Sequence, residues 1–323
     1  MSITVSDIVR EYGAYYENAG QNKNRILSLL TQGRELTGFC TPIKTDNTIF
    51  RLSNAAFQSL VQPFQKSFTQ KGGATFTPNE IRVFNLKIDD EFYPDDIKAT
   101  WLGFLAANKV SREEWPLVKW LIEEYYMKQI DRDMELNEYY KGVYAAPTTN
   151  VAGPDGTGMN GLQMQLKAGV DAGTMNSINI GALDASTIFV QVAEFTDYIS
   201  EVYQGVPMNV CMSKHWYKKY MQDKRAQGFY QKTSDAQIDA GIDFTPQSVV
   251  GLAAMTGTND IFCTPKANLI HITSETLSKN QFKLEESKRV VSVMGDWWEG
   301  LGFGMNQAVW TSIRPTGSGS GSV

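Results

Sequence analysis

The chain has 323 residues, of which 42% are hydrophobic and 20% charged, so it is long enough for about two globular domains with buried cores. Its 30 Lys and Arg residues against 35 Asp and Glu residues give a net charge of −5, which excludes a uniformly basic surface that binds DNA through its phosphates. Cys40, Cys211 and Cys263 are too few and too far apart for a disulfide framework or a metal motif, and they indicate a reducing compartment. The first residues lack the pattern of a secretory signal, and no apolar run approaches the roughly 18 residues of a membrane span, so we expect no membrane partner.

The first part of the chain predicts two short helices. Residues 4–33 have apolar side chains at helical spacing, interrupted at Asn18, Ala19 and Gly20. Helices this short are marginally stable alone, because they form too few hydrogen bonds to offset nucleation. Two arrangements therefore remain open, an arm that lies on a neighbouring surface and a segment packed on its own core.

Residues 49–93 change to an extended pattern, with alternating apolar and polar residues at 84–89, and predict a long two-stranded excursion. Its tip is expected at residues 71–79, where Gly, Pro and Asn favour a turn. An isolated hairpin is only marginally stable in water, so either a helix of this subunit or another subunit must cover it. We expect an intersubunit contact at four residues of this tip: Lys71, Gly72, Gly73 and Phe76.

Two helices follow in the pattern. Pro94 with two aspartates after it predicts a helix start, because proline suits the first turn and carboxylates stabilise the positive end of the helix dipole. Residues 116–141 form the longest helical signal, roughly 40 Å at 1.5 Å per residue, which stops at Gly142. Its apolar residues recur every four positions: Val118, Ile122, Tyr126, Ile130 and Met134. We expect this row to be covered by residues from the C-terminal part: 290–293, Trp297, Trp298 and Phe303.

The Gly-rich stretch at residues 144–184 predicts a domain boundary. Beyond it, the pattern predicts a second compact domain of alternating helices and strands, and then a strand-rich end at 281–313. The expected elements of that domain are a helix at 186–203, a strand at 207–212, a helix at 214–226 capped by Ser213, and strands at 261–264 and 269–273.

Three motifs have both a functional and a structural interpretation. Cys211 and His215, four residues apart, could form a nucleophile pair, but a buried cysteine ending a strand is the favoured interpretation. The glycines between Gly153 and Gly161 lack the Lys-Ser/Thr of a phosphate loop, which favours a linker. Aromatic residues among the cations of residues 214–232 could stack on bases, but their spacing favours a helix packed on a sheet. We therefore predict no catalytic, cofactor-binding or metal-binding residue, no cofactor and no enzymatic activity.

The order of these elements resembles the major capsid proteins of tailed double-stranded DNA bacteriophages with the Hong Kong 97-type fold. Residues 206–230 (VPMNVCMSKHWYKKYMQDKRAQGFY) resemble the strand, helix and turn of that family's axial domain. Residues 249–272 (VVGLAAMTGTNDIFCTPKANLIHI) are similar to the segment and strand pair that follow, with Ala253 where many relatives carry proline. No long charged scaffolding region precedes the arm, so we expect a separate scaffold or a compact assembly route.

The resemblance implies an α+β fold and a particular division of the chain. Its parts would be an N-terminal arm (1–48), an extended loop (49–93), a peripheral domain with a long spine helix (94–150), an axial domain (151–285), and a return to the peripheral sheet with a flexible tail (286–323).

The same resemblance implies a structural subunit that assembles with itself, as pentamers and hexamers, into an icosahedral shell around double-stranded DNA. Its expected partners are the packaged DNA through weak contacts, a portal, and scaffold or decoration proteins. Assembly would take place in the host cytoplasm, and the protein would reside in the virion capsid. An encapsulin-like nanocompartment shell, which shares this fold, is the alternative, and the long arm favours the phage.

Overall fold

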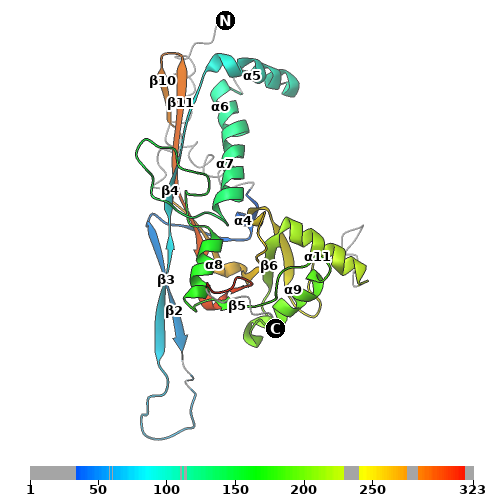
Figure 1. Ribbon diagram of the computed structural model, residues 1–323. Helices are drawn as coiled ribbons and strands as arrows, with labels where there is room; N and C mark the ends of the chain where they lie inside the picture. The colour runs from blue at the N-terminus through cyan, green and yellow to red at the C-terminus, as the bar shows by residue number, and fades with distance from the viewer. Residues whose placement is uncertain are drawn as a thin grey trace.

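A computed structural model describes residues 34–57, 59, 61–109, 111, 112, 115–228, 240–274 and 283–316. The helices predicted within residues 4–33 and the tail after residue 316 lie outside the described residues. The described part folds into an elongated lobe with a long helix, a rounder lobe beside it, and a two-stranded hairpin that projects away from both (Figure 1). This mixture of helices and largely antiparallel sheets confirms the predicted α+β class.

The elongated first lobe is built on a five-stranded sheet. Its strands run in the order β1 (Thr41–Lys44), β9 (Leu269–Thr273), β11 (Val290–Phe303) and β10 (Lys283–Ser287), and β4 (Phe84–Phe92) also pairs with β11. Strand β11 has 14 residues, which is long enough to pair with β10 and β4 along its first part and with β9 along its last five residues. Buried and half-buried positions alternate at its start, as expected where one face covers a core.

The predicted excursion at residues 49–93 is corrected in its second half. The hairpin consists of β2 (Ile49–Phe57) and β3 (Ala74–Arg82), and the described residues between them, 59 and 61–73, mostly precede the predicted tip at 71–79. The alternating stretch after it, β4, leaves the hairpin and pairs with β11 instead. The alternation identified a half-buried strand correctly, but periodicity carries no information about the partner strand.

The long helix forms as predicted and covers one face of the first sheet. It runs through α6 (Leu117–Leu121), η2 (Ile122–Tyr126), α7 (Met127–Asp133) and η3 (Met134–Glu138), in which η2 and η3 are wider π-helical turns. The predicted apolar row shares one core with Val291, Val293, Trp297 and Phe303, which confirms the packing expected from the sequence. The prediction that Trp298 covers the long helix was wrong. Its side chain points to the opposite face of β11 and packs in a separate cluster with Ile270 and Ile272.

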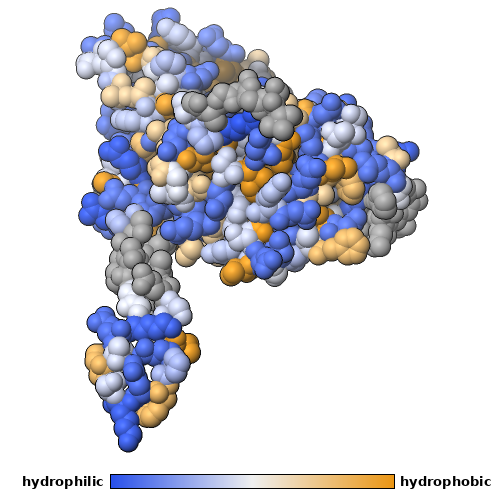
Figure 2. All heavy atoms as spheres, turned by 60° about the horizontal axis from the view of Figure 1, so that its bottom comes forward, coloured by the Kyte–Doolittle hydropathy of each residue, from blue (hydrophilic) through white to orange (hydrophobic). Residues whose placement is uncertain are grey.

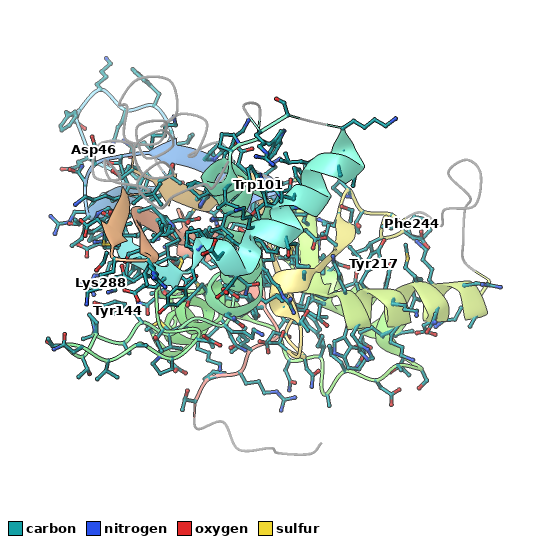
Figure 3. The ribbon with its side chains drawn as sticks, turned by 90° about the horizontal axis from the view of Figure 1, so that it is seen from above. Asp46, Trp101, Tyr144, Tyr217, Phe244 and Lys288 are labelled. Atoms are coloured by element: carbon teal, nitrogen blue, oxygen red, sulfur yellow. The ribbon has the colours of Figure 1, made fainter. Side chains whose placement is uncertain are left out.

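Helix α5 (Pro94–Asn108) begins at the predicted proline and buries Trp101 and Leu105 against the same core as the long helix. Figure 3 labels Trp101 on this helix, seen from above. The helix ends at Lys109, which adopts a left-handed conformation at φ 55°.

The rounder second lobe contains a second five-stranded sheet. Its order is β5 (Asn176–Ser177), β12 (Trp310–Thr311), β8 (Phe262–Pro265), β6 (Met208–Ser213) and β7 (Ser248–Leu252). Helices α9 (Ile188–Asp197) and α11 (Lys214–Ala226) pack on one face through a shared apolar core. The predicted cap is confirmed, since the Ser213 hydroxyl accepts a hydrogen bond from the Trp216 backbone N–H. The helix predicted at 186–203 is divided, because α9 ends at Asp197 and a short helix, α10, spans Glu201–Gln204.

The division of the chain between the two sheets differs from the predicted 151–285 segment. Helix α8 (Leu162–Asp171) packs in the core of the first lobe, and β9 pairs with β1 and β11 of the first sheet. Strand β12, in the predicted return to the first sheet, pairs with β5 and β8 of the second. The chain therefore crosses between the lobes more often than its turn signals indicated, because those signals mark element ends and not sheet membership. Three 3₁₀ turns occur within these connections: η4 (Ala253–Met255), η5 (Lys266–Asn268) and η6 (Asn306–Ala308).

The described end of the predicted N-terminal arm is part of the protein's own core. Helix α4 (Glu35–Gly38) buries Leu36, and Cys40 is buried beside it. Strand β1 then pairs in parallel with β9. Residues 34–44, which the resemblance assigned to the arm, therefore belong to the core of this chain, whereas the two arrangements left open for residues 4–33 lie outside the described residues. Within the described residues, no helix is long and apolar enough to cross a membrane.

Candidate functional site

The β2–β3 hairpin is the first candidate site. Nine residue pairs hold its strands in antiparallel register, from Ile49 opposite Arg82 to Phe57 opposite Ala74. Its base is anchored, because Ile81 is buried with Ile270 and Ile272 of β9, and Phe50 packs against them. Beyond this base the hairpin extends away from the body of the protein (Figure 1). Such a two-stranded ribbon has little apolar cover of its own.

The tip of the hairpin, residues 58–73, carries exposed apolar side chains. Val61, Phe64 and Phe68 are 85%, 93% and 97% exposed. Figure 2 shows apolar side chains on this projecting tip. The Gln62 side-chain amide donates to the Thr69 carbonyl at 2.8 Å, which holds the two sides of the loop together. Aromatic side chains held in water at the end of a projection are typical of a contact surface.

The four predicted contact residues fall on two different elements. Lys71, Gly72 and Gly73 lie at the end of the tip, where Gly72 has a φ of 86° that favours glycine. Phe76 lies in β3 opposite Ala55 and not at the tip. Sequence reasoning missed Phe64 and Phe68, although two phenylalanines within a polar run (PFQKSF) were a signal that could have identified them.

A buried ionic cluster in the first lobe was also missed by sequence reasoning. The Arg34 guanidinium donates from Nη1 to both oxygens of Glu299 at 2.9 Å and from Nε to Asp131 at 2.8 Å. His271 Nε2 lies 2.6 Å from Glu299 Oε1, and the Tyr139 hydroxyl donates to the same oxygen at 2.5 Å. These residues come from the start of the described chain, the helix end, β9 and β11. A glutamate within the apolar pattern of β11 was the available signal.

The electrostatics of the cluster favour an ionised Glu299. Burial alone would raise its pKa, but the Arg34 charge, and then hydrogen bonds from His271 and Tyr139, outweigh burial and lower the pKa below its usual value. The pKa of Arg34 is raised, because attraction to Glu299 and Asp131 exceeds the effect of its own burial. Arg34 Nη2 has no hydrogen-bond partner among the described residues. The cluster therefore joins the start of the described chain, the long helix, β9 and β11 through charge and hydrogen bonds, and it does not resemble an acid–base pair poised for catalysis.

The structure does not support the nucleophile pair considered for Cys211 and His215. Cys211 is buried in the core, whereas His215 is exposed on the first turn of α11. Burial raises the pKa of the Cys211 thiol well above its usual value, so little thiolate forms at neutral pH. Among the described residues, no group of three or more His, Cys, Asp or Glu side chains could hold a metal ion.

The basic segment at residues 214–228 packs as a helix on a sheet. Tyr220 is fully buried, and Trp216 and Tyr217 pack against the same core, so their rings are not presented for stacking on bases. Lys224 is itself buried and donates to the Gly241 carbonyl at 2.7 Å. Residues 229–232 of the predicted basic stretch lie outside the described residues.

The predicted Gly-rich linker forms a loop at 143–158 beside β4 and the long helix. That loop closes one side of a surface hollow of about 940 Å³. Strand β4, the end of the long helix, and the two tryptophans of β11 line the other sides. Tyr144 of the loop packs on Phe84 of β4 with ring centroids 4.9 Å apart. Seen from above, Tyr144 lies on the side opposite Tyr217 and Phe244 of the second lobe (Figure 3). Glu138 anchors the loop by accepting hydrogen bonds from the backbone N–H groups of Gly158 and Met159.

Comparison with known proteins identifies the fold. No family model and no curated protein matches the sequence. A chain of the solved structure "Satellite phage P4 procapsid including size determination (Sid) protein" matches with a TM-score of 0.58 and 10% identity, covering 97% of this chain and 99% of that one. A chain of "Capsid of empty GTA particle computed with C5 symmetry" matches with a TM-score of 0.51 and 11% identity, covering 87% and 89%. The protein thus shares, over nearly its whole length, a fold found in phage capsid structures.

Proposed function

We propose that this chain is a major capsid protein of a tailed double-stranded DNA bacteriophage with the Hong Kong 97-type layout. It assembles with itself into an icosahedral shell that encloses the genome. The observation that carries the proposal is the fold likeness to a chain of the phage procapsid structure across 97% of this chain. The exposed aromatic tip of the hairpin adds support, because a monomer leaves it in water and an assembly covers it.

Each part of the molecule has a role in this proposal. The first lobe, with the long helix as its spine, is the peripheral domain, and the second lobe is the axial domain that forms pentamers and hexamers. The hairpin is the extended loop that packs on an adjacent subunit. Its contact surface comprises Lys71, Gly72, Gly73 and Phe76, together with Phe64 and Phe68.

The charge of the chain suits a container. A net charge of −5 lets packed DNA touch the shell without tight phosphate binding. The chain performs no catalytic step and needs no cofactor in this role. It assembles in the host cytoplasm with a portal and with scaffold or decoration proteins, and it remains in the virion capsid.

Assembly of the expressed full-length chain tests the proposal. We expect closed shells by electron microscopy and fast-sedimenting particles on a sucrose gradient. The double variant Phe64→Ser/Phe68→Ser should remain folded, with an unchanged circular dichroism spectrum, but should sediment as small species. Gln65→Ser/Gln70→Ser, on the same exposed loop, is the matched control and should assemble normally.

Only compact monomers of the wild-type chain, under all assembly conditions and with co-expressed scaffold, would refute the capsid role. The contents of particles purified from their source separate the phage capsid from an encapsulin-like compartment. Packaged double-stranded DNA supports the former, whereas a cargo protein supports the latter.

A further inference from the structure

The outward face of α11 in the second lobe carries a group of basic side chains. The aromatic residues of this helix turn inward: Tyr220 is fully buried, and Tyr217 packs on Gly251 of β7. At 3.6 residues per turn, the residues on the opposite side are all polar or basic: Lys214, His215, Lys218, Lys219, Gln222 and Arg225. The helix extends to the end of the second lobe that lies farthest from the first lobe (Figure 1).

Most of these cations have no carboxylate beside them. The one acidic residue of the helix, Asp223, is buried and accepts a hydrogen bond from the Phe189 backbone N–H at 2.9 Å. Lys214 pairs with Glu35 at 2.8 Å. Among the described residues, no ion pair involves the three remaining cations of the outward face, Lys218, Lys219 and Arg225. These three are therefore available to a negatively charged partner.

The segment that precedes α11 has the opposite charge. Residues 168–213 contain five acidic residues and no lysine or arginine. Three of the acids, Glu194, Asp197 and Glu201, are exposed on α9 and α10. A surface whose charges serve only solubility has both signs interspersed. The separation of the charges onto different helices therefore indicates a partner for the basic helix.

The composition of the outward face favours a phosphate backbone over a protein surface as that partner. Protein interfaces are depleted in lysine and centre on buried aromatic or apolar anchors. The outward side of α11 offers no such anchor, because Trp216, Tyr217 and Tyr220 pack on the core of the second lobe. Interfaces with DNA are much more positively charged, and phosphate contacts require only cations that reach the backbone. Duplex DNA is therefore the partner that fits this face.

The spacing of the cations agrees with this choice. Lys218 and Arg225 are seven residues apart, so two turns of the helix separate them by roughly 10 Å. Each strand of a DNA duplex carries a phosphate about every 3.4 Å along the axis, so this span covers about three phosphates. The long side chains of the three cations therefore have phosphates of a single strand within reach.

We infer that the outward face of α11 contacts the phosphate backbone of the enclosed double-stranded DNA through Lys218, Lys219 and Arg225. This inference rests on the proposed function, and it assigns the contact with DNA to a particular surface, which then faces the interior of the shell. One subunit binds weakly, because it neutralises few phosphates, but the shell repeats the contact many times along one genome.

The salt dependence of DNA binding tests this contact. The unassembled full-length chain is titrated with a short fluorescent duplex at several salt concentrations, and anisotropy reports the binding constant. Each neutralised phosphate contributes about −0.9 to the slope of the logarithm of that constant against the logarithm of salt concentration. The triple variant Lys218→Gln/Lys219→Gln/Arg225→Gln should therefore make the slope less negative by about 2.7.

A second triple variant is the matched control. Arg132→Gln/Lys288→Gln/Arg289→Gln removes three exposed cations from the first lobe and changes the net charge equally. Its slope should equal that of the wild-type chain. Glutamine has nearly the same helix propensity as lysine and arginine, so the α11 variant should keep its circular dichroism spectrum.

Particles that contain DNA provide an independent measurement that needs no substitution. A small acetylating reagent is added to DNA-filled and emptied particles, and the modified lysines are identified by mass spectrometry. We expect less acetylation of Lys218 and Lys219 in the filled particles and equal acetylation of Lys288 in both.

The outcomes separate the inference from the proposed function. A slope that the α11 variant leaves unchanged, or that the control changes equally, overturns the DNA contact, and shells formed by the same chains leave the capsid role intact. An α11 variant that keeps the wild-type slope but forms no shells also overturns it, because α11 would then face the acidic α9 and α10 of a neighbouring copy. A wild-type chain that forms no shells removes the proposed function and, with it, the enclosed DNA as the partner.

Discussion

The buried cluster around Glu299 permits a quantitative prediction. Replacing Glu299 by Gln keeps the side-chain shape but removes the charge that faces Arg34, whose side chain is completely buried. Glu299 accepts hydrogen bonds from Arg34 and His271. The amide N–H group of the glutamine would face one of these two side chains and could not accept from it. Breaking a buried ion pair in this way leaves an uncompensated charge, and we expect a loss of about 3–5 kcal/mol in the free energy of unfolding.

An exposed ion pair in the same protein is the matched control. Arg51 and Glu80 make the same kind of contact at 2.9 Å across the hairpin, but their side chains are 71% and 48% exposed. Because water screens this pair, Glu80→Gln should cost no more than about 1 kcal/mol. Urea unfolding of the unassembled full-length chain, followed by tryptophan fluorescence, measures both free energies.

The dependence on pH follows from the direction of the pKa shift. The pKa of Glu299 is lower in the folded protein than in the unfolded chain, where its ordinary value is 4.5. The unfolded state therefore binds the proton more readily, so the stabilisation is fully present above that value and is lost as the pH falls below it. Wild-type stability should decrease more steeply between about pH 5 and pH 3 than that of Glu299→Gln. Equal losses for the two Gln variants, or parallel pH profiles, would refute the account of the cluster.

Three further predictions concern the core, a close backbone contact and the thiols. Ile130→Ala should cost about 2–5 kcal/mol in unfolding free energy, because this side chain of the long helix is buried in the core that the helix shares with β11. The variant should therefore form no shells, and normal shells on a sucrose gradient would contradict this. Gly161→Ala should lower the melting temperature, since a Cβ there would lie 2.5 Å from the Tyr140 carbonyl oxygen, and an unchanged calorimetric transition would be inconsistent with that approach. Burial raises the pKa of the Cys40 and Cys263 thiols to about 12 and that of the Cys211 thiol well above its usual value. A maleimide at neutral pH should therefore label the folded chain slowly and the urea-unfolded chain fully. Rapid labelling of the folded chain would disprove the burial of these three thiols.

Residue patterns were sufficient for the elements whose signals are local. Pro94 marks the start of α5 and Ser213 caps α11, because a cap acts on backbone groups within three or four residues. The four-residue spacing of apolar side chains located the long helix and the face that it buries. The α+β class follows from these same local patterns.

Partners that are distant in the chain could not be obtained in this way. Strand β4 carries the alternation of a half-buried strand, yet whether it continues the hairpin or joins β11 depends on contacts about 200 positions away. Arg34 and Glu299 are separated by 265 positions, and neither has a local signal for the other. Phe64 and Phe68 were identifiable as unusual in a polar loop, but their exposure depends on the length and direction of the hairpin. Local patterns specify where elements begin and which faces are apolar, whereas chain topology decides which apolar faces meet within one copy and which remain for another.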